Sequence, residues 1–161
     1  MLFNVSQLLR ETTGSARSFV LERGGPIHKG TAVLTRAPDG VLVQVRADVV
    51  FEAICSRCVA PFGYETTIEF DEIYHQQVDV ASGRKLADAE DPEAFLIDLH
   101  HMIDITEAVR QYSETAAEMQ PLCRADCPGI CPVCGNDQNV APCSCDRAPI
   151  DPRWANLAAL N

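Results

Sequence analysis

The chain carries eight cysteines, and their spacing separates them into an isolated pair and a group of six. The pair is Cys55 and Cys58, and the six further thiols are Cys123, Cys127, Cys131, Cys134, Cys143 and Cys145. Cysteines at this density, in a chain that opens without a secretion signal, are more often metal ligands than disulfide partners. Because Zn²⁺ takes four ligands in a tetrahedron, eight thiolates would serve two ions with none left over. We therefore expect two zinc ions per chain.

The spacing of the last four cysteines is the more specific signal. Two residues separate Cys131 from Cys134, Gly135 follows directly, and eight residues separate Cys134 from Cys143, which is followed by Ser144 and Cys145. Two intervening residues let both sulfurs reach one ion, and a following glycine can take a positive φ. This set is predicted to hold one metal; a set of disulfides is the alternative.

The second predicted site consists of the four thiols that remain, and this grouping rests on elimination: Cys55, Cys58, Cys123 and Cys127. It would tie a turn between two strands to the end of a helix. The alternative is a self-contained tail, in which Cys123 or Cys127 replaces one of the last four.

Catalysis is not expected at either site. A catalytic zinc keeps an open position, usually among histidine or carboxylate ligands, whereas both of these sites are closed by cysteine. We interpret His28, His75, His100 and His101 as surface or core side chains. Cys55 and Cys58 lack the helix-opening context that activates a redox thiolate. The sequence shows no Ser/His/Asp triad and no phosphate-binding glycine loop, so we predict a protein that is not an enzyme.

The elements that position these thiols predict an α+β fold. A short helix is expected over 5–11, and alternating apolar residues predict strands at 18–22, 29–36, 41–54 and 64–74 that form a small antiparallel, barrel-like sheet. A packing helix is expected over 104–119, with Asp104 as N-cap and Glu107 at the capping-box position. Its predicted apolar stripe comprises Ile105, Ala108, Val109, Tyr112, Ala116 and Met119.

Two regions are predicted along the chain. Residues 1–120 form an α+β body that includes the first cysteine pair and an acidic loop at 81–93. Residues 121–161 form a cysteine-rich tail with a zinc knuckle and a short C-terminal helix that begins at Asp151 and contains Trp154. The tail is poor in large apolar residues, so a metal is the obvious means of ordering it.

Charge bears on the choice of partner. The net charge is −10, and the segment 65–118 alone holds 14 acidic and 3 basic residues. Such a surface repels phosphate backbones, which disfavours strong direct binding to nucleic acid. The alternative is a basic face on the sheet, built from Arg17, Arg23, Lys29, Arg36, Arg46 and Arg57. No apolar stretch approaches the length of a membrane helix, so we expect no membrane partner. We expect a cytoplasmic protein.

The motifs of the tail resemble those of a known family. Residues 122–136, with Asn139, Cys143, Cys145 and Asp151-Pro152-Arg153, are similar to the YceD family, the large ribosomal RNA subunit accumulation proteins. The opening residues Asn4 to Leu9 and the pair Cys55 and Cys58 share the resemblance. It implies a role in the accumulation or processing of large-subunit ribosomal RNA, with no enzymatic activity attached.

Together these observations predict a non-enzymatic ribosome-biogenesis factor. The acidic middle of the chain could hold a basic ribosomal protein, or a pre-ribosomal particle, until it meets ribosomal RNA. Zinc-dependent direct RNA binding is the alternative, and a redox- or metal-responsive switch is a third. The identity of the partner, the step affected and the oligomeric state are left open by the sequence.

Overall fold

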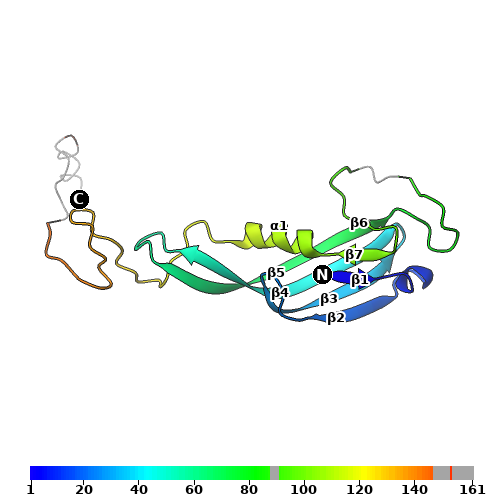
Figure 1. Cartoon of the computed structure of the whole chain (residues 1–161), viewed down its shortest axis with the longest axis horizontal. Helices are drawn as coiled ribbons and strands as arrows, with labels where there is room; N and C mark the ends of the chain where they lie inside the picture. The colour runs from blue at the N-terminus through cyan, green and yellow to red at the C-terminus, as the bar shows by residue number, and fades with distance from the viewer. Residues whose placement is uncertain (88–90, 147–152, 154–161) are drawn as a thin grey trace. The chain divides into compact units, whose positions relative to one another are not determined.

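The computed structural model describes residues 1–87, 91–146 and 153 (Figure 1). Its contacts divide the chain into two compact units. Unit 1 comprises Met1–Phe51 and Tyr64–Ala117, and unit 2 comprises Glu52–Gly63 and Glu118–Asn161. Whether 1–120 and 121–161 are separate folding regions stays a prediction.

Unit 1 is mostly sheet. A five-stranded sheet has the order β2-β3-β4-β5-β6, and a second sheet pairs β1 with β7. The strands are β1 (Leu2–Asn4), β2 (Ala16–Leu21), β3 (Ile27–Ala37), β4 (Gly40–Ile54), β5 (Pro61–Gln76), β6 (Leu96–Ile97) and β7 (Met102–Asp104). A 3-10 turn, η1 (Leu8–Arg10), follows β1, and helix α1 (Thr106–Ala116) follows β7.

The pairing of β3 with β4 shows why the large sheet forms. The two strands run antiparallel from Ala37 opposite Gly40 to Ile27 opposite Val49. Alternate residues of β4 are buried, including Val41, Val43 and Val45, while Gln44 and Arg46 between them are exposed. This alternation is typical of an antiparallel sheet with one face on the core and one in water. Gly40 is required at the turn, because a Cβ there would lie 2.0 Å from the backbone oxygen of Tyr74.

Helix α1 and the small sheet contribute the rest of the core of unit 1. Ile103 of β7 and Ala108 of α1 are fully buried in one cluster with the valines of β4. Tyr112 of α1 stacks on Phe70 of β5 at a centroid distance of 4.5 Å, and its hydroxyl donates to Glu72 over 2.5 Å. These contacts fix α1 against β5.

The predicted helix is present, but its ends were wrong. It begins at Thr106, because Asp104 still belongs to β7, where it pairs with Leu2. The Asp104 carboxylate accepts hydrogen bonds from the backbone and the hydroxyl of Thr106, and no side chain caps the helix at Ile105. Met119 was wrongly assigned to the apolar stripe, since it lies beyond the helix and is 99% exposed.

Other expectations also need correction. The described residues form two open sheets and no closed barrel, because β6 has only two residues and pairs parallel to β5, which leaves β2 and β6 as edges. The expected N-terminal helix over 5–11 is reduced to η1. Part of the predicted acidic loop (88–90) and the predicted C-terminal helix with Trp154 lie outside the described residues.

Candidate metal centres

The first cysteine pair lies in the turn between β4 and β5. The Cys55 amide donates to the carbonyl of Ala60, and the Val59 amide donates to the carbonyl of Cys55, both over 2.9 Å. These bonds close a tight turn over residues 55–60. As a result, the thiols of Cys55 and Cys58, the two cysteines of this CxxC turn, lie on the same side of it. Cys55 and Cys58 are buried, although neither belongs to the hydrophobic core of unit 1.

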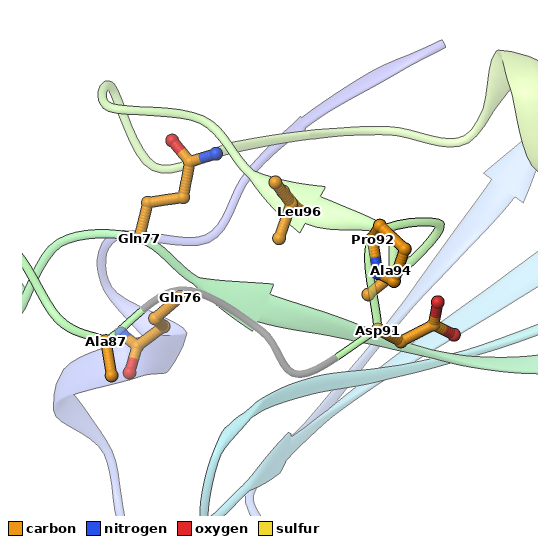
Figure 2. Close-up of a pocket in the computed structure, with 7 residues that line it drawn as sticks. All are labelled: Gln76, Gln77, Ala87, Asp91, Pro92, Ala94 and Leu96. Atoms are coloured by element: carbon orange, nitrogen blue, oxygen red, sulfur yellow. The ribbon is translucent and has the colours of Figure 1, made fainter.

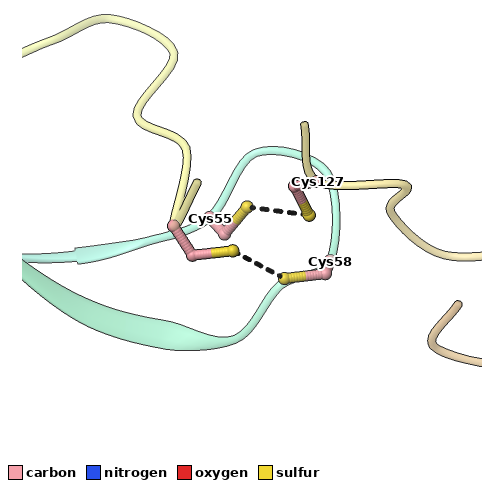
Figure 3. Close-up of side chains that lie close together, drawn as sticks. Cys55, Cys58 and Cys127 are labelled. Carbon is pink, nitrogen blue, oxygen red and sulfur yellow. Dashed lines mark hydrogen bonds between the residues drawn. The ribbon is translucent and has the colours of Figure 1, made fainter. Parts of the chain in front are cut away.

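The tail supplies two further thiols to this turn, and together they make cluster 1 (Cys55, Cys58, Cys123 and Cys127). The Sγ atoms of Cys55 and Cys127 are 3.9 Å apart, and those of Cys58 and Cys123 are 3.7 Å apart (Figure 3). All four sulfurs lie within 4.8 Å of one another. The tail is held there by the Ser56 amide, which donates to the carbonyl of Pro121.

Arg57 fastens the loop after Cys127 to the first turn. Its guanidinium donates to the carbonyl of Cys127 over 3.0 Å, and its own carbonyl accepts from the amide of Ile130 over 3.0 Å. The approach is so close that a Cβ on Gly129 would lie 2.9 Å from the Arg57 oxygen, and Gly129 also has a φ of +78°. Only glycine suits this position.

The remaining four thiols form cluster 2 (Cys131, Cys134, Cys143 and Cys145), again with all sulfurs within 4.8 Å. The Gly135 amide donates to the carbonyl of Cys131 over 2.9 Å, and the Cys131 amide donates to the carbonyl of Asn136 over 2.8 Å. Cluster 2 is the more accessible of the two: Cys131 is buried, but Cys134 is exposed. The elimination argument therefore predicted the grouping that the structure has.

Two neighbouring amides outside the thiol sets support one cluster each. The Gln138 side chain donates to the Sγ of Cys143 over 3.2 Å, and that of Asn139 donates to the Sγ of Cys127 over 3.5 Å. Gln138 is buried, which is uncommon for an amide side chain. Sequence reasoning gave Gln138 no role, because its proximity to Cys143 depends on how the loop folds.

The eight thiols are all free, and their packing perturbs their ionisation. Backbone amides of Cys123 and Cys58 lower the pKa of Cys55 to about 6, whereas burial and the neighbouring thiols, with Cys127 foremost, raise the pKa of Cys123 to about 12. In cluster 2, the Cys145 amide lowers the pKa of Cys143 to about 6, while Cys134 and Cys143 raise that of Cys145 to about 12. Four thiolates this close repel one another, so a cation is needed to hold all four ionised.

The donor set and spacing of both clusters suit a soft, tetrahedral ion. Sulfurs about 2.3 Å from zinc form a tetrahedron with edges of about 3.8 Å. The sulfur separations of 3.7 Å and 3.9 Å in cluster 1 fit this size and are too long for disulfides. Each cluster could therefore hold one metal ion with four cysteine ligands, the arrangement of structural zinc sites.

A hollow lies beside β6 in unit 1. That hollow, of about 220 Å³, is lined by Gln76, Gln77 and Asp91 together with four apolar residues (Figure 2). Among the described lining residues, Asp91 supplies one carboxylate and the two glutamines supply amides. The four histidines do not join either thiol cluster.

In the described ranges no helix is long and apolar enough to cross a membrane.

A mostly β-sheet unit and a second unit that contains two four-thiol clusters define a cysteine-rich candidate metalloprotein. Residues 43–161 match the family described as large ribosomal RNA subunit accumulation protein YceD. The chain belongs to this family, as its tail motifs indicated.

The curated relatives come from mycobacteria. The chain is 32% identical over 124 residues to an uncharacterized protein of Mycobacterium tuberculosis, with 76% of this chain and 56% of the relative covered. It is 30% identical over 143 residues to an uncharacterized protein of Mycobacterium leprae, with 88% of this chain and 62% of the relative covered. The chain thus spans about three fifths of the length of these relatives. No solved structure matches it.

Proposed function

We propose that the protein is a non-enzymatic factor for the large ribosomal subunit that supports ribosomal RNA accumulation by holding a basic ribosomal protein. The family description supports the link to large-subunit RNA. The observation that carries the choice of partner is charge: the segment 65–118 has 14 acidic and 3 basic residues. Most of its carboxylates therefore have no cation within the segment to neutralise them.

The acidic side chains face outward on two elements of unit 1. On β5, Glu65, Glu69 and Asp71 alternate with residues that point to the core, and all three are exposed. Glu69 is already paired with Arg46, and Glu65 lies 3.1 Å from the ring of His28, so Asp71 is the least engaged by cations of the three. On α1, Glu107 and Glu114 are exposed on the side opposite the buried Ala108 and Val109. Surfaces of one sign attract partners of the other sign and raise the rate of encounter.

Direct RNA binding receives less support, because five of the six cations proposed for it are engaged within the protein, and Arg23 is the exception among the contacts that the structure describes. Arg46 pairs with Glu69 over 2.9 Å, Arg17 pairs with Glu11 over 2.6 Å, and Lys29 lies 3.5 Å from Asp48. Arg36 and Arg57 donate to backbone carbonyls. An RNA phosphate would have to displace these partners before it gained a contact.

In this proposal the two metal ions would have a structural role and would stabilise the fold of unit 2. Cys55, Cys58, Cys123, Cys127, Cys131, Cys134, Cys143 and Cys145 would hold two Zn²⁺ ions. The hydrophobic cluster of unit 2 is small and consists largely of cysteines and their immediate neighbours, so metal binding would supply folding free energy that apolar burial does not.

Capture of partners from a bacterial lysate at physiological salt tests the proposal. The zinc-loaded protein should retain a basic large-subunit protein, and the double charge reversal Glu65→Lys with Asp71→Lys should release it. Glu22→Lys with Glu52→Lys is the matched control, since both residues are exposed and lie outside the acidic segment. Recovery of ribosomal RNA without any ribosomal protein would contradict the proposal.

The salt dependence of RNA affinity distinguishes our proposal from the alternative, direct RNA binding. If the protein binds RNA directly, the logarithm of the affinity falls steeply with the logarithm of salt concentration, and Arg36→Gln with Arg46→Gln flattens that slope. Under our proposal, purified protein binds RNA weakly and these substitutions change little.

A further inference from the structure

The two thiol clusters differ in how far solvent reaches their ligands. In cluster 1 three ligands are buried and Cys123 is half-buried, whereas in cluster 2 only Cys131 is buried and Cys134 is exposed. Zinc can expand its coordination from four ligands to five, so an incoming ligand attacks where a site is open to solvent. Cys134 gives cluster 2 such an opening, and cluster 1 has no ligand as exposed.

Contacts other than a metal order the backbone that carries the ligands of cluster 1. Cys55 and Cys58 lie in the turn between the long strands β4 and β5, and two backbone hydrogen bonds of 2.9 Å close this turn. The Arg57 guanidinium holds the carbonyl of Cys127 over 3.0 Å. Little ordering is left for a metal to supply at this cluster, so metal binding keeps most of its free energy.

Half of cluster 2 lacks this support from secondary structure. Cys143 and Cys145 lie within residues 142–146, which are outside helices, strands and turns. The Gln138 side chain donates to the Sγ of Cys143 over 3.2 Å, which holds the sulfur and not the backbone. Ordering this segment costs conformational entropy that a metal at cluster 2 has to offset. The net affinity of cluster 2 is therefore the lower of the two.

Opening of cluster 2 would leave the loop of cluster 1 in place. Three residues separate Cys127 from Cys131, and the Ile130 amide between them donates to the carbonyl of Arg57 over 3.0 Å. This bond fixes the chain just before the first ligand of cluster 2, so the segment that can open begins after Cys131. Opening would cost cluster 1 the hydrogen bond from Asn139 to the Sγ of Cys127, but none of its own ligands.

We propose that cluster 2 is an exchangeable metal site and cluster 1 a permanent one, so that a falling metal supply empties cluster 2 first and opens the segment 132–146. Exchange begins at Cys134, the exposed ligand. The inference rests on the proposed metal ligation and is independent of the proposed ribosomal partner. It makes the tail a device that responds to metal supply, while the turn of cluster 1 keeps its structure.

Timed removal of metal from the zinc-loaded full chain tests the order of release. After addition of excess ethylenediaminetetraacetate, one part of each sample goes to native mass spectrometry, and the other is alkylated with iodoacetamide and mapped by peptide mass spectrometry. The chain with one ion should accumulate, with alkyl groups on Cys134, Cys143 and Cys145 before any reach Cys55 or Cys58. Denatured, chelated protein is the control for reagent preference and should be labelled at all eight cysteines together.

Single-cluster variants give a second measurement. Cys131→Ser should keep only the ion of cluster 1 and Cys55→Ser only that of cluster 2, and the second variant should lose its ion sooner. Should Cys55→Ser fail to fold, amide NMR of the native chain with one ion serves instead. The Asn136 and Cys143 signals should then lose their dispersed positions, while the Ile130 signal keeps its position.

Loss of both ions in a single step, or alkylation of Cys55 and Cys58 first, would overturn the inference. Alkylation of Cys134 while both ions remain bound would also overturn it, since Cys134 would then not be a ligand. Purified, folded protein without metal would remove the proposed ligation and this inference with it. The expected order of release in a chain that captures no basic ribosomal protein would leave this inference standing and contradict the proposed partner.

Discussion

Val59 follows Cys58 with a φ of 61°, and Gly135 follows Cys134 with a φ of 74°. Each amide donates over 2.9 Å to the carbonyl of the first cysteine of its own CxxC turn, so the two turns have the same backbone design. The second turn uses the residue that takes this conformation freely, whereas the first uses a β-branched residue for which it is strained. The strained residue lies beside cluster 1, where the turn must aim Cys55 and Cys58 at one point.

This comparison predicts that Val59→Gly stabilises the zinc-loaded protein. Relief of the left-handed conformation is worth about 1 kcal/mol after the entropy of glycine in the unfolded chain is subtracted. Chemical denaturation at saturating Zn²⁺ measures it. The reciprocal Gly135→Val should destabilise by a similar amount. Val133→Gly, at an exposed position in the second turn without a positive φ, is the control and should not stabilise. A loss of stability in Val59→Gly would show that the valine side chain makes a contact that outweighs the strain.

Removing one cysteine ligand should release the metal ion of its own cluster and leave the other ion bound. Cys131→Ser should lower the metal content from two to one per chain and loosen the tail, while the far-UV signal of the sheet persists. Cys55→Ser should lose the other ion. Ser144→Ala, between two cluster 2 ligands, should retain both. Native mass spectrometry and circular dichroism measure these changes; loss of both ions or of the sheet in Cys131→Ser would show that the clusters do not act separately.

The supporting amides should act on one cluster each. Gln138→Leu removes the donor to Cys143 and should weaken the metal of cluster 2 about tenfold, because hydrogen bonds to ligands stabilise the charged thiolate. Asn139→Leu should weaken cluster 1 instead, through Cys127. Competition with a chromophoric chelator, combined with mass spectrometry of partly loaded protein, distinguishes the two. Equal weakening of both clusters by either substitution would contradict this assignment.

The stability of unit 1 should depend on the ionisation of Tyr74 at high pH. Burial, with the charges of Glu72 and Asp104, raises the pKa of Tyr74 well above its ordinary value near 10. The unfolded chain therefore loses this proton first, so the stabilisation is complete below about pH 10 and is lost progressively above it. Melting temperatures from pH 8 to 11 should fall less steeply for Tyr74→Phe than for the native chain. Parallel curves would rule out this titration as the cause.

The sequence predicted the thiol clusters better than the sheet. Cys131 and Cys134 with Gly135 form a local motif, and once they were paired with Cys143 and Cys145 the other four followed by elimination. Whether a sheet closes into a barrel depends on contacts between strands that are distant in the sequence. The alternation of apolar and polar residues within one strand carries no information on these contacts. The two-residue strand β6 has too short a pattern to detect, yet its parallel pairing with β5 sets one open edge.

Local signals also failed where tertiary contacts compete with them. Asp104 has the residue type and spacing of an N-cap, but its pairing with Leu2 keeps it in β7 and moves the start of the helix. Val59 looks unremarkable in the sequence, because nothing about a valine after Cys58 indicates a positive φ. Gln138 becomes a partner of Cys143 only when the loop between them has closed.

Metal content per chain tests the central claim most directly. Native mass spectrometry of freshly purified protein, with thiol titration of the same sample before and after denaturation in chelator, gives the number of ions and the state of all eight cysteines. We predict two zinc ions, no disulfides, and eight thiols that react only after the metal is removed. A folded chain without metal, or one whose cysteines are joined in disulfides, would contradict the account.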